Sequence, residues 1–276
     1  MLNSLLSFCV FLLCSFVASG CPDCEGHRID TVLLKSQIIG NDIEMMRNMA
    51  FDQAISLAGN ARMIAAVKEA DFKEADREKI ANILNNFESA RKSAFFTILD
   101  SEGQVIFRSS RPEQWGDSQA HLRSVGEVLT TKKPCVFFDS TVVSRLTIRA
   151  GAPIFDEAGE MIGIVTNGFR LDTNDWVDEM QRRLGNDLAI TVFHGNERVA
   201  STVRINANER ADERAIGTVL DNPLVVKTVL DDMVQFIGDA IVRGTAMKVL
   251  YAPIYNEGDS KAIGMFFIGM PQQRRR

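Results

Sequence analysis

The sequence predicts an α+β protein in which a long N-terminal helix supports two tandem antiparallel sheets. Two observations carry this prediction. The strand–turn–strand motif APIFDEAGEMIGIVTNGF, residues 152–169, returns near the end of the chain as APIYNEGDSKAIGMFFIGM, residues 252–270. An apolar stripe of helical period precedes both copies. The chain has 276 residues with 46% apolar and 24% charged residues, which fits one or two packed domains.

The long helix is expected from Thr31 to about Ala70, and a second helix from Asp76 to Lys92. Apolar residues recur every three or four positions in the first segment: Ile39, Ile43, Met46, Ala50, Ala54, Leu57, Ala61 and Ile64. The opposite side carries polar residues: Lys35, Asp42, Glu44, Arg47, Asn48 and Gln53. Such a length exceeds an ordinary globular helix and suits a stalk behind more than one domain, or a dimer seam.

The two halves repeat the same order of elements. Each opens with a hairpin, at 95–109 and at 188–202, with turns at 100–103 and 194–197. A looser stretch with a short helix follows, at 119–130 in the first half and at 223–231 in the second, before the repeated hairpin closes the half. Each half is therefore expected to form a small antiparallel sheet of about five strands.

A short helix is expected to join the halves, with Asp172 as its N-cap and Gly185 as its stop. The expected organisation is then a signal peptide or membrane anchor at 1–24, the helical segment at 25–92, a first sheet domain at 93–184 and a second at 185–273.

Residues 2–20 contain no charged side chain, which fits a cleaved signal peptide or an uncleaved anchor. The small residues before Cys21 also resemble a lipoprotein processing site. All three alternatives place the rest of the chain outside the cytoplasm. The CPDC motif at 21–24 is interpreted as a processing site or local disulfide rather than a redox pair, since no βαβ pattern surrounds it. Cys135 is expected to be a buried small hydrophobe.

Composition and motifs argue against several functions. The net charge of -5 disfavours nucleic-acid binding. The sequence has no GxSxG, HExxH or GxxxxGK[ST] motif, and its three histidines have no metal-ligand partner at a telling spacing. We therefore expect no enzyme activity, no metal and no cofactor.

Side-chain alternation points to a binding face in the first half. Arg145, Thr147 and Arg149 fall on one face of a predicted strand, and the intervening Leu146 and Ile148 can pack on the long helix. The equivalent positions in the second half are apolar, with Met247, Val249 and Tyr251 opposite Thr147, Arg149 and Gly151. A polar face that carries arginines suits a carboxylate or phosphate, so the first half is expected to hold an anionic ligand.

The loop after Phe107 adds further candidates. Trp115 is expected to wall the pocket, and Asp117 to receive an amine if the ligand is an amino acid. The full expected ligand-binding set is Arg108, Arg111, Trp115, Asp117, Arg145, Thr147 and Arg149. In the alternative interpretation these residues are surface polar groups: Arg108 pairs with Asp100 or Glu102 of its own hairpin, and the strand arginines are solvated.

Five motifs, in this order and spacing, resemble the double Cache sensor modules of bacterial chemoreceptors and sensor kinases, of the Cache 3/Cache 2 fusion type. They are RPEQWGDS at 111–118, IRAGAPIFDEAGEMIGIVTNGFRLDTNDWVDEM at 148–180, VFHGNERVAST at 192–202, AIGT at 215–218 and the final hairpin at 252–270. The resemblance implies two PAS-like sheets outside the membrane, a small-molecule pocket in the membrane-distal sheet, and a homodimer through the long helix.

The expected function is an extracytoplasmic sensing module for signal transduction or chemotaxis that binds a small organic anion or amino acid. The family usually continues from the last strand into a transmembrane helix and cytoplasmic domains, so the chain is expected to be part of a receptor or a stand-alone binding module. The alternative is a dimerisation or protein-interaction stalk that binds no small ligand. A dimer that is insensitive to metabolites would favour this alternative.

Overall fold

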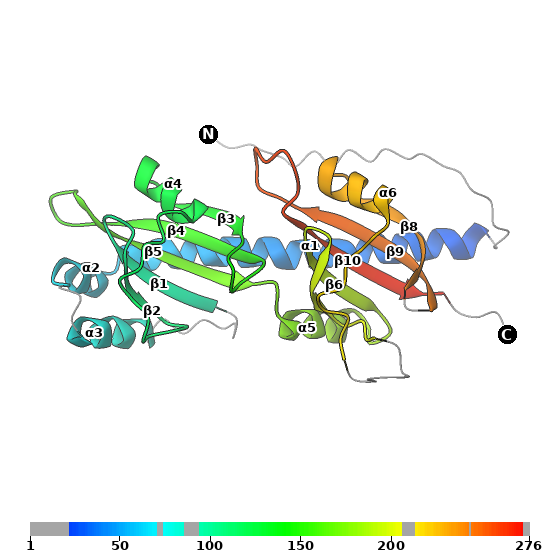
Figure 1. Cartoon of the computed structure of the whole chain (residues 1–276), viewed down its shortest axis with the longest axis horizontal. Helices are drawn as coiled ribbons and strands as arrows, with labels where there is room; N and C mark the ends of the chain where they lie inside the picture. Colours follow the sequence, from blue (N-terminus) through cyan, green and yellow to red (C-terminus); the bar gives the residue numbers. More distant parts are fainter. Residues whose placement is uncertain (1–21, 71–73, 86–93, 206–212, 243, 273–276) are drawn as a thin grey trace.

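A computed structural model describes residues 22–70, 74–85, 94–205, 213–242 and 244–272, and shows two sheets lying end to end along one helix (Figure 1). The helix is α1, Pro22–Ala58. The first sheet has the order β2-β1-β5-β4-β3 and contains β1 Ala94–Asp100, β2 Val105–Arg108, β3 Cys135–Asp139, β4 Thr147–Phe155 and β5 Met161–Arg170. All its neighbouring strands are antiparallel.

The second sheet repeats this order as β7-β6-β10-β9-β8. Its strands are β6 Ala189–His194, β7 Glu197–Ser201, β8 Phe236–Val242, β9 Thr245–Ile254 and β10 Gly264–Pro271, all antiparallel to their neighbours. The motif that recurs in the sequence forms β4–β5 in one sheet and β9–β10 in the other. The expected fold class and the internal repeat are therefore confirmed.

The apolar stripe of α1 packs against both sheets. Its members Ile39, Ile43, Met46, Ala50, Ala54 and Leu57 are all buried. Leu146 and Ile148 belong to the same core, as the strand alternation predicts. Burying a large apolar side chain contributes roughly 1.5–3 kcal/mol, so this shared seam holds the sheets to one helix.

The long helix is shorter than expected, since it ends at Ala58. Gly59 and Asn60 interrupt it, and α2, Ala61–Lys68, starts anew. The Asn60 side-chain oxygen accepts hydrogen bonds from the backbone N–H groups of Arg62 and Met63, at 3.0 and 3.2 Å. This N-cap satisfies donors that a new helix leaves free. The buried face restarts in α2 at Met63, Ala66 and Val67, whereas Ala61 of the predicted stripe is exposed.

The remaining helices are α3 Glu74–Asn85, α4 Arg123–Thr131, α5 Asn174–Leu184 and α6 Pro223–Val226, which runs into the π-helical turn η1 Lys227–Asp231. The expected continuation of the second helix, residues 86–92, lies outside the described residues. Gly185 ends α5 as predicted. Asp172 is not its N-cap: its carboxylate instead accepts from the Arg170 Nε at 2.8 Å and the Arg145 backbone N at 2.7 Å, and Thr173 precedes the helix.

Two charged side chains, Asp42 and Lys248, are buried, although Asp42 was expected on the polar side of the long helix. Asp42 is 3% exposed and accepts hydrogen bonds from Trp176 Nε1 and Arg183 Nη1, each at 3.0 Å. It therefore ties α5 to α1. Lys248 is 5% exposed and lies 2.9 Å from Asp239 on the neighbouring strand. Both positions follow helix or strand periodicity into the core, and each charge is retained because it is paired.

Of the expected signal or anchor segment, 1–24, residues 1–21 lie outside the described residues, and residues 22–24 belong to the first turn of α1. The side chain of Cys24 is also outside the described part. Within the described ranges, no helix combines the length and apolar character needed to cross a membrane. Cys135 is a half-buried free cysteine whose thiol donates to the Ser124 carbonyl oxygen at 3.3 Å.

Candidate functional site

A hollow of about 2050 Å³ opens beside the first sheet, on the face opposite the helix-packed core. It is lined by β1, β2 and β4, by the loops after β2 and β3, and by α5. Its volume exceeds the roughly 300–1,000 Å³ of an ordinary small-molecule site, so one ligand would fill only part of it.

The strand register builds the inner end of the hollow. Phe95, Gly168 and Arg149 lie opposite one another on β1, β5 and β4. Gly168 carries no side chain, and a Cβ there would meet the Phe95 ring at 2.6 Å. The ring therefore lies over the glycine, and the Arg149 Cζ stands 4.7 Å from the ring centre. This distance is typical of a cation–π contact, which fixes the guanidinium in place.

Arg149 is a buried cation whose Nε donates no hydrogen bond to the described part of the chain. It is 6% exposed, and its Nε has no hydrogen-bond partner among the described residues. The Asp139 Oδ2 is 3.7 Å from that Nε, which is longer than a hydrogen bond. Burial lowers the pKa of Arg149 and Arg108 adds to the effect, although Asp139 opposes it. An anion placed here would offset the cost of burying this charge.

Arg108 is held by Asp117. Its Nη2 donates to both carboxylate oxygens of Asp117, at 2.7 and 2.6 Å, and its side chain is 12% exposed. The Arg108 Nε is buried without a hydrogen-bond partner within the described ranges. The alternative pairing with Asp100 or Glu102 is not observed, since Asp100 accepts backbone N–H groups of its own turn. In this structure Asp117 is thus the counter-charge of Arg108, whereas the sequence predicts that it receives a ligand amine.

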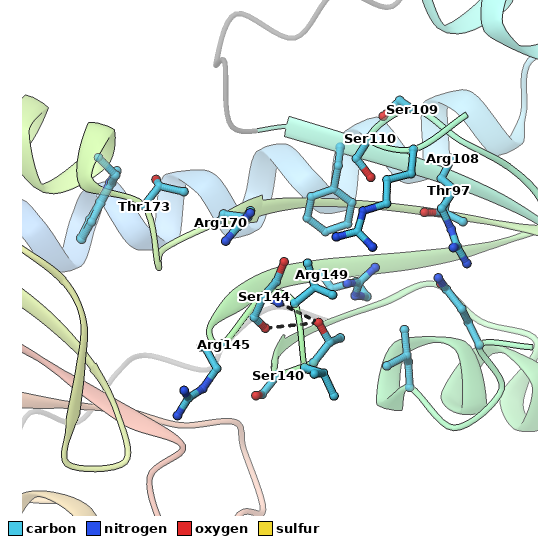
Figure 2. Close-up of a pocket in the computed structure, with 18 of the residues that line it drawn as sticks. Thr97, Arg108, Ser109, Ser110, Ser140, Ser144, Arg145, Arg149, Arg170 and Thr173 are labelled. Atoms are coloured by element: carbon cyan, nitrogen blue, oxygen red, sulfur yellow. Dashed lines mark hydrogen bonds between the residues drawn. The ribbon is translucent and has the colours of Figure 1, made fainter. Parts of the chain in front are cut away.

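Arg145 lines the hollow but engages the second domain. Its Nη2 lies 3.0 Å from Glu197 Oε2 and 3.4 Å from His194 Nδ1. Figure 2 shows Arg108, Thr97 and Arg149 around one space, with Arg145 set apart and pointing toward the second domain. The structure therefore places Arg145 at the junction between the sheets.

The other three expected residues lie in different settings. Arg111 lines the edge of the hollow. Thr147 is fully buried and donates to the Asp139 carbonyl oxygen at 3.1 Å, so it supports β3 and does not line the space. Trp115 is 42% exposed, lies outside the lining, and carries the Arg77 guanidinium 3.6 Å above its ring.

Several lining residues were missed by the sequence analysis. Phe95 and Thr97 share the face of Arg149 through the register of β1 and β5, and this pairing is visible only once the strands are placed. Two buried hydroxyl groups near them, Thr166 Oγ1 and Ser124 Oγ, have no hydrogen-bond partner within the part of the chain that the structure describes. Alternation along β1 would have identified Thr97, whereas the hydroxyl groups depend on how α4 covers the sheet.

The equivalent face of the second sheet is apolar, as predicted. Met247, Val249 and Tyr251 form a cluster with Phe193 and Phe267. The ring of Tyr251 lies 4.8 Å from that of Phe267. This cluster lies on the face of the second sheet that corresponds to the Arg149 face of the first.

Comparisons with known proteins agree with this architecture. The sequence pattern of the double sensory domain of two-component sensor kinases matches residues 37–272. The sensor histidine kinase DpiB of Escherichia coli (strain K12) is 27% identical over 130 residues, which cover 47% of this chain and 22% of that protein. This chain thus matches about a fifth of the curated relative.

Two solved structures share the fold at low identity. The sensor domain of the Vibrio cholerae histidine kinase DctB superposes with a TM-score of 0.52 at 9% identity, over 91% of this chain and 98% of that one. The periplasmic sensory domain of the Campylobacter jejuni chemoreceptor Tlp1 gives 0.50 at 9% identity, over 90% and 96%. The family match covers most of the chain, and the fold agrees with it. The chain therefore belongs to the double Cache family, the double sensory domains of two-component sensor kinases.

Proposed function

We propose that this sensory domain binds a small organic anion or an amino acid at the inner end of the hollow, with Arg149 as the principal partner of its carboxylate. One observation carries the proposal: a buried guanidinium faces the hollow without a hydrogen bond from its Nε to any described residue. A planar guanidinium matches a carboxylate in a two-point contact, and such charge-assisted bonds are stronger than neutral ones.

Neighbouring groups support the ligand in specific ways. Arg108 adds positive charge, and Thr97 lines the same end of the hollow. Asp117 is 55% exposed, so an ammonium group of an amino acid can approach its carboxylate without breaking into the core. Asp117 and Asp139 already offset part of the positive charge of Arg108 and Arg149. We therefore expect the site to favour a singly charged or zwitterionic ligand over one with several negative charges.

We place the first domain far from the membrane and outside the cytoplasm. The start of α1 and the end of β10 lie at the same end of the molecule, beside the second sheet (Figure 1). In a receptor whose membrane segments join these ends, the second domain would lie near the membrane and the hollow would face the exterior. Ligand binding would act on the receptor only through a difference in affinity between two arrangements of the domains.

A homodimer through α1 completes the proposal. The two sheets cover the apolar stripe of α1, so a second copy of the helix would have to pack on the opposite face. Positions 31, 34, 38, 41, 45, 48, 52 and 55 follow alternating spacings of three and four along that face. Leu34, Met45 and Ile55 are 59%, 44% and 41% exposed there. This spacing is typical of a two-helix seam, in which Thr31, Asn41, Asn48 and Asp52 are the polar positions.

A thermal-shift screen of small carboxylic acids and amino acids tests the ligand. At a concentration a hundredfold above its Kd, a true ligand should raise the Tm by about 5 °C or more. Arg149→Gln should abolish the shift. Arg198→Gln is the matched control, since Arg198 stands 5.0 Å from the Phe193 ring in the second domain. A flat response across the panel, or a shift that survives Arg149→Gln, would favour the ligand-free stalk.

A further inference from the structure

The turn between β9 and β10 of the second domain holds an edge strand of the first. Among the described strands β3 pairs only with β4, so its outer edge has no neighbouring strand there. At Phe138 this edge is occupied by a side chain: the Phe138 N–H donates to Asn256 Oδ1 at 2.6 Å, and Asn256 Nδ2 donates to the Phe138 carbonyl oxygen at 3.0 Å. One amide thus supplies both bonds that a further strand would make at that residue.

Asn256 is itself fixed in position. It is 3% exposed, and its Nδ2 and backbone N both donate to Asp259 Oδ2 at 3.0 Å. The other oxygen of Asp259 accepts from Arg123 of α4 at 2.6 Å, and the Arg123 guanidinium lies 4.4 Å from the Phe137 ring centre. Burial opposes ionisation of Asp259, but the bonds from Arg123 and Asn256 prevail and hold its pKa below the usual range.

This contact lies next to the binding end of the hollow. Asp139 follows Phe138 in β3, and its Oδ2 is the carboxylate oxygen 3.7 Å from Arg149 Nε. Phe137, on the other side of Phe138, lies opposite Arg149 in the strand register. Phe138 therefore links the Asn256 amide to the residue that carries the counter-charge of Arg149.

We propose that Asn256 and Asp259 are positioning residues through which the second domain fixes the strand that faces Arg149. This inference rests on the proposed role of Arg149 in holding the ligand. A ligand on Arg149, or its substitution, changes the electrostatic attraction between Arg149 and Asp139. Because Asp139 follows Phe138, that change alters the two hydrogen bonds between Phe138 and Asn256 in the β9–β10 turn. Because energetic coupling between sites is reciprocal, the state of the second domain equally sets the affinity of the hollow.

A double-mutant cycle followed by hydrogen exchange tests this coupling without any ligand. Arg149→Gln should speed amide exchange in residues 256–263 by about threefold or more in an otherwise unchanged chain, and should have no such effect when combined with Asn256→Ala. Arg149→Lys provides a second, milder variant if Arg149→Gln fails to fold. Asn196→Ala is the control, since the Asn196 amide donates to Leu220 within the second domain, and the effect of Arg149→Gln should persist in it.

Unchanged exchange in residues 256–263 after both Arg149 substitutions would overturn the positioning role. An equal effect in the Asn256→Ala background would overturn it too, because the coupling would then bypass the amide. The cycle uses no ligand, so its failure is distinct from that of the proposed function. A thermal-shift screen in which no acid raises the Tm would overturn only the proposed ligand. A double-mutant cycle in which amide exchange does not change would overturn only the positioning role.

Discussion

The guanidinium of Arg149 and the ring of Phe95 face each other across Gly168, 4.7 Å from Cζ to ring centre. Three strands contribute to this contact, and the middle one contributes only the absence of a side chain. The ring shields one side of the cation from water, and the hollow remains open at another. The guanidinium of Arg149 is therefore accessible from the hollow, which is the side from which a ligand can approach.

Gly168→Ala should destabilise the protein, because its Cβ would meet the Phe95 ring at 2.6 Å and the Ile148 backbone oxygen still closer. Overpacking of this kind costs about 1–3 kcal/mol in free energy of unfolding, measured by urea denaturation. Gly40→Ala is the control, because α1 has open space around Gly40 and the change should be neutral or stabilising. Equal stability of the two variants would refute the close contact.

Asp42→Ala should cost about 1–3 kcal/mol in free energy of unfolding, since it leaves the buried Trp176 indole N–H without its acceptor and removes a partner of the half-exposed Arg183 guanidinium. The emission of Trp176 should also change as α5 loosens from α1. Glu44→Ala, which removes an exposed carboxylate from the same helix outside the proposed seam, should change stability by less than about 0.5 kcal/mol. Unfolding curves of the two variants that coincide would show that α5 is held by other contacts.

His194 should make stability fall as the pH drops below its ordinary pKa of 6.5. Burial, and then the charge of Arg145, lower the pKa of His194, although Glu197 and Asp172 oppose this. Near and below pH 6.5 the unfolded chain thus binds more protons than the folded one, and stability present above 6.5 is lost as the pH falls through the folded pKa.

His194→Gln should therefore flatten the fall in Tm between about pH 7 and pH 5, the range in which a histidine titrates. Asn196→Ala, a change of an uncharged side chain in the adjoining turn, should leave the slope as it is. The assignment fails if the two substitutions alter the slope equally.

Met45→Glu should weaken self-association at least about tenfold, because it places a charge in the centre of the proposed helix seam. Sedimentation velocity across a range of concentrations measures this. Gln37→Glu adds the same charge at another exposed position of α1, outside the seam, and should have little effect. A monomer at all concentrations in the unmodified chain, or a dimer that Met45→Glu leaves intact, would exclude this face.

The internal repeat, the two antiparallel sheets and the helix that packs behind them could be predicted from sequence. Each depends on the periodicity of apolar residues within one segment of the chain. The apolar stripe and the alternation of Leu146, Thr147 and Ile148 predict their faces without further information. The break at Asn60 and the burial of Asp42 were missed, since a cap and a buried ion pair depend on partners distant in the chain.

The candidate site was predictable only in part for the same reason. Arg149 stands on the predicted face, whereas Thr147 supports β3 and Trp115 stacks with Arg77. Alternation assigns a side chain to a face but does not say which part of that face is covered. Phe95 and the Asn256 bridge required strand register and domain packing, and these follow from no single segment.

The affinity of the protein for a carboxylate, measured by isothermal titration calorimetry with and without Arg149, tests the central claim most directly. The best acid or amino acid should bind the unmodified chain, and Arg149→Gln should raise its Kd by about 30-fold or more, since it removes one partner of a buried charge pair. Binding of equal strength to both proteins, or no binding heat from any member of the panel, would contradict the account.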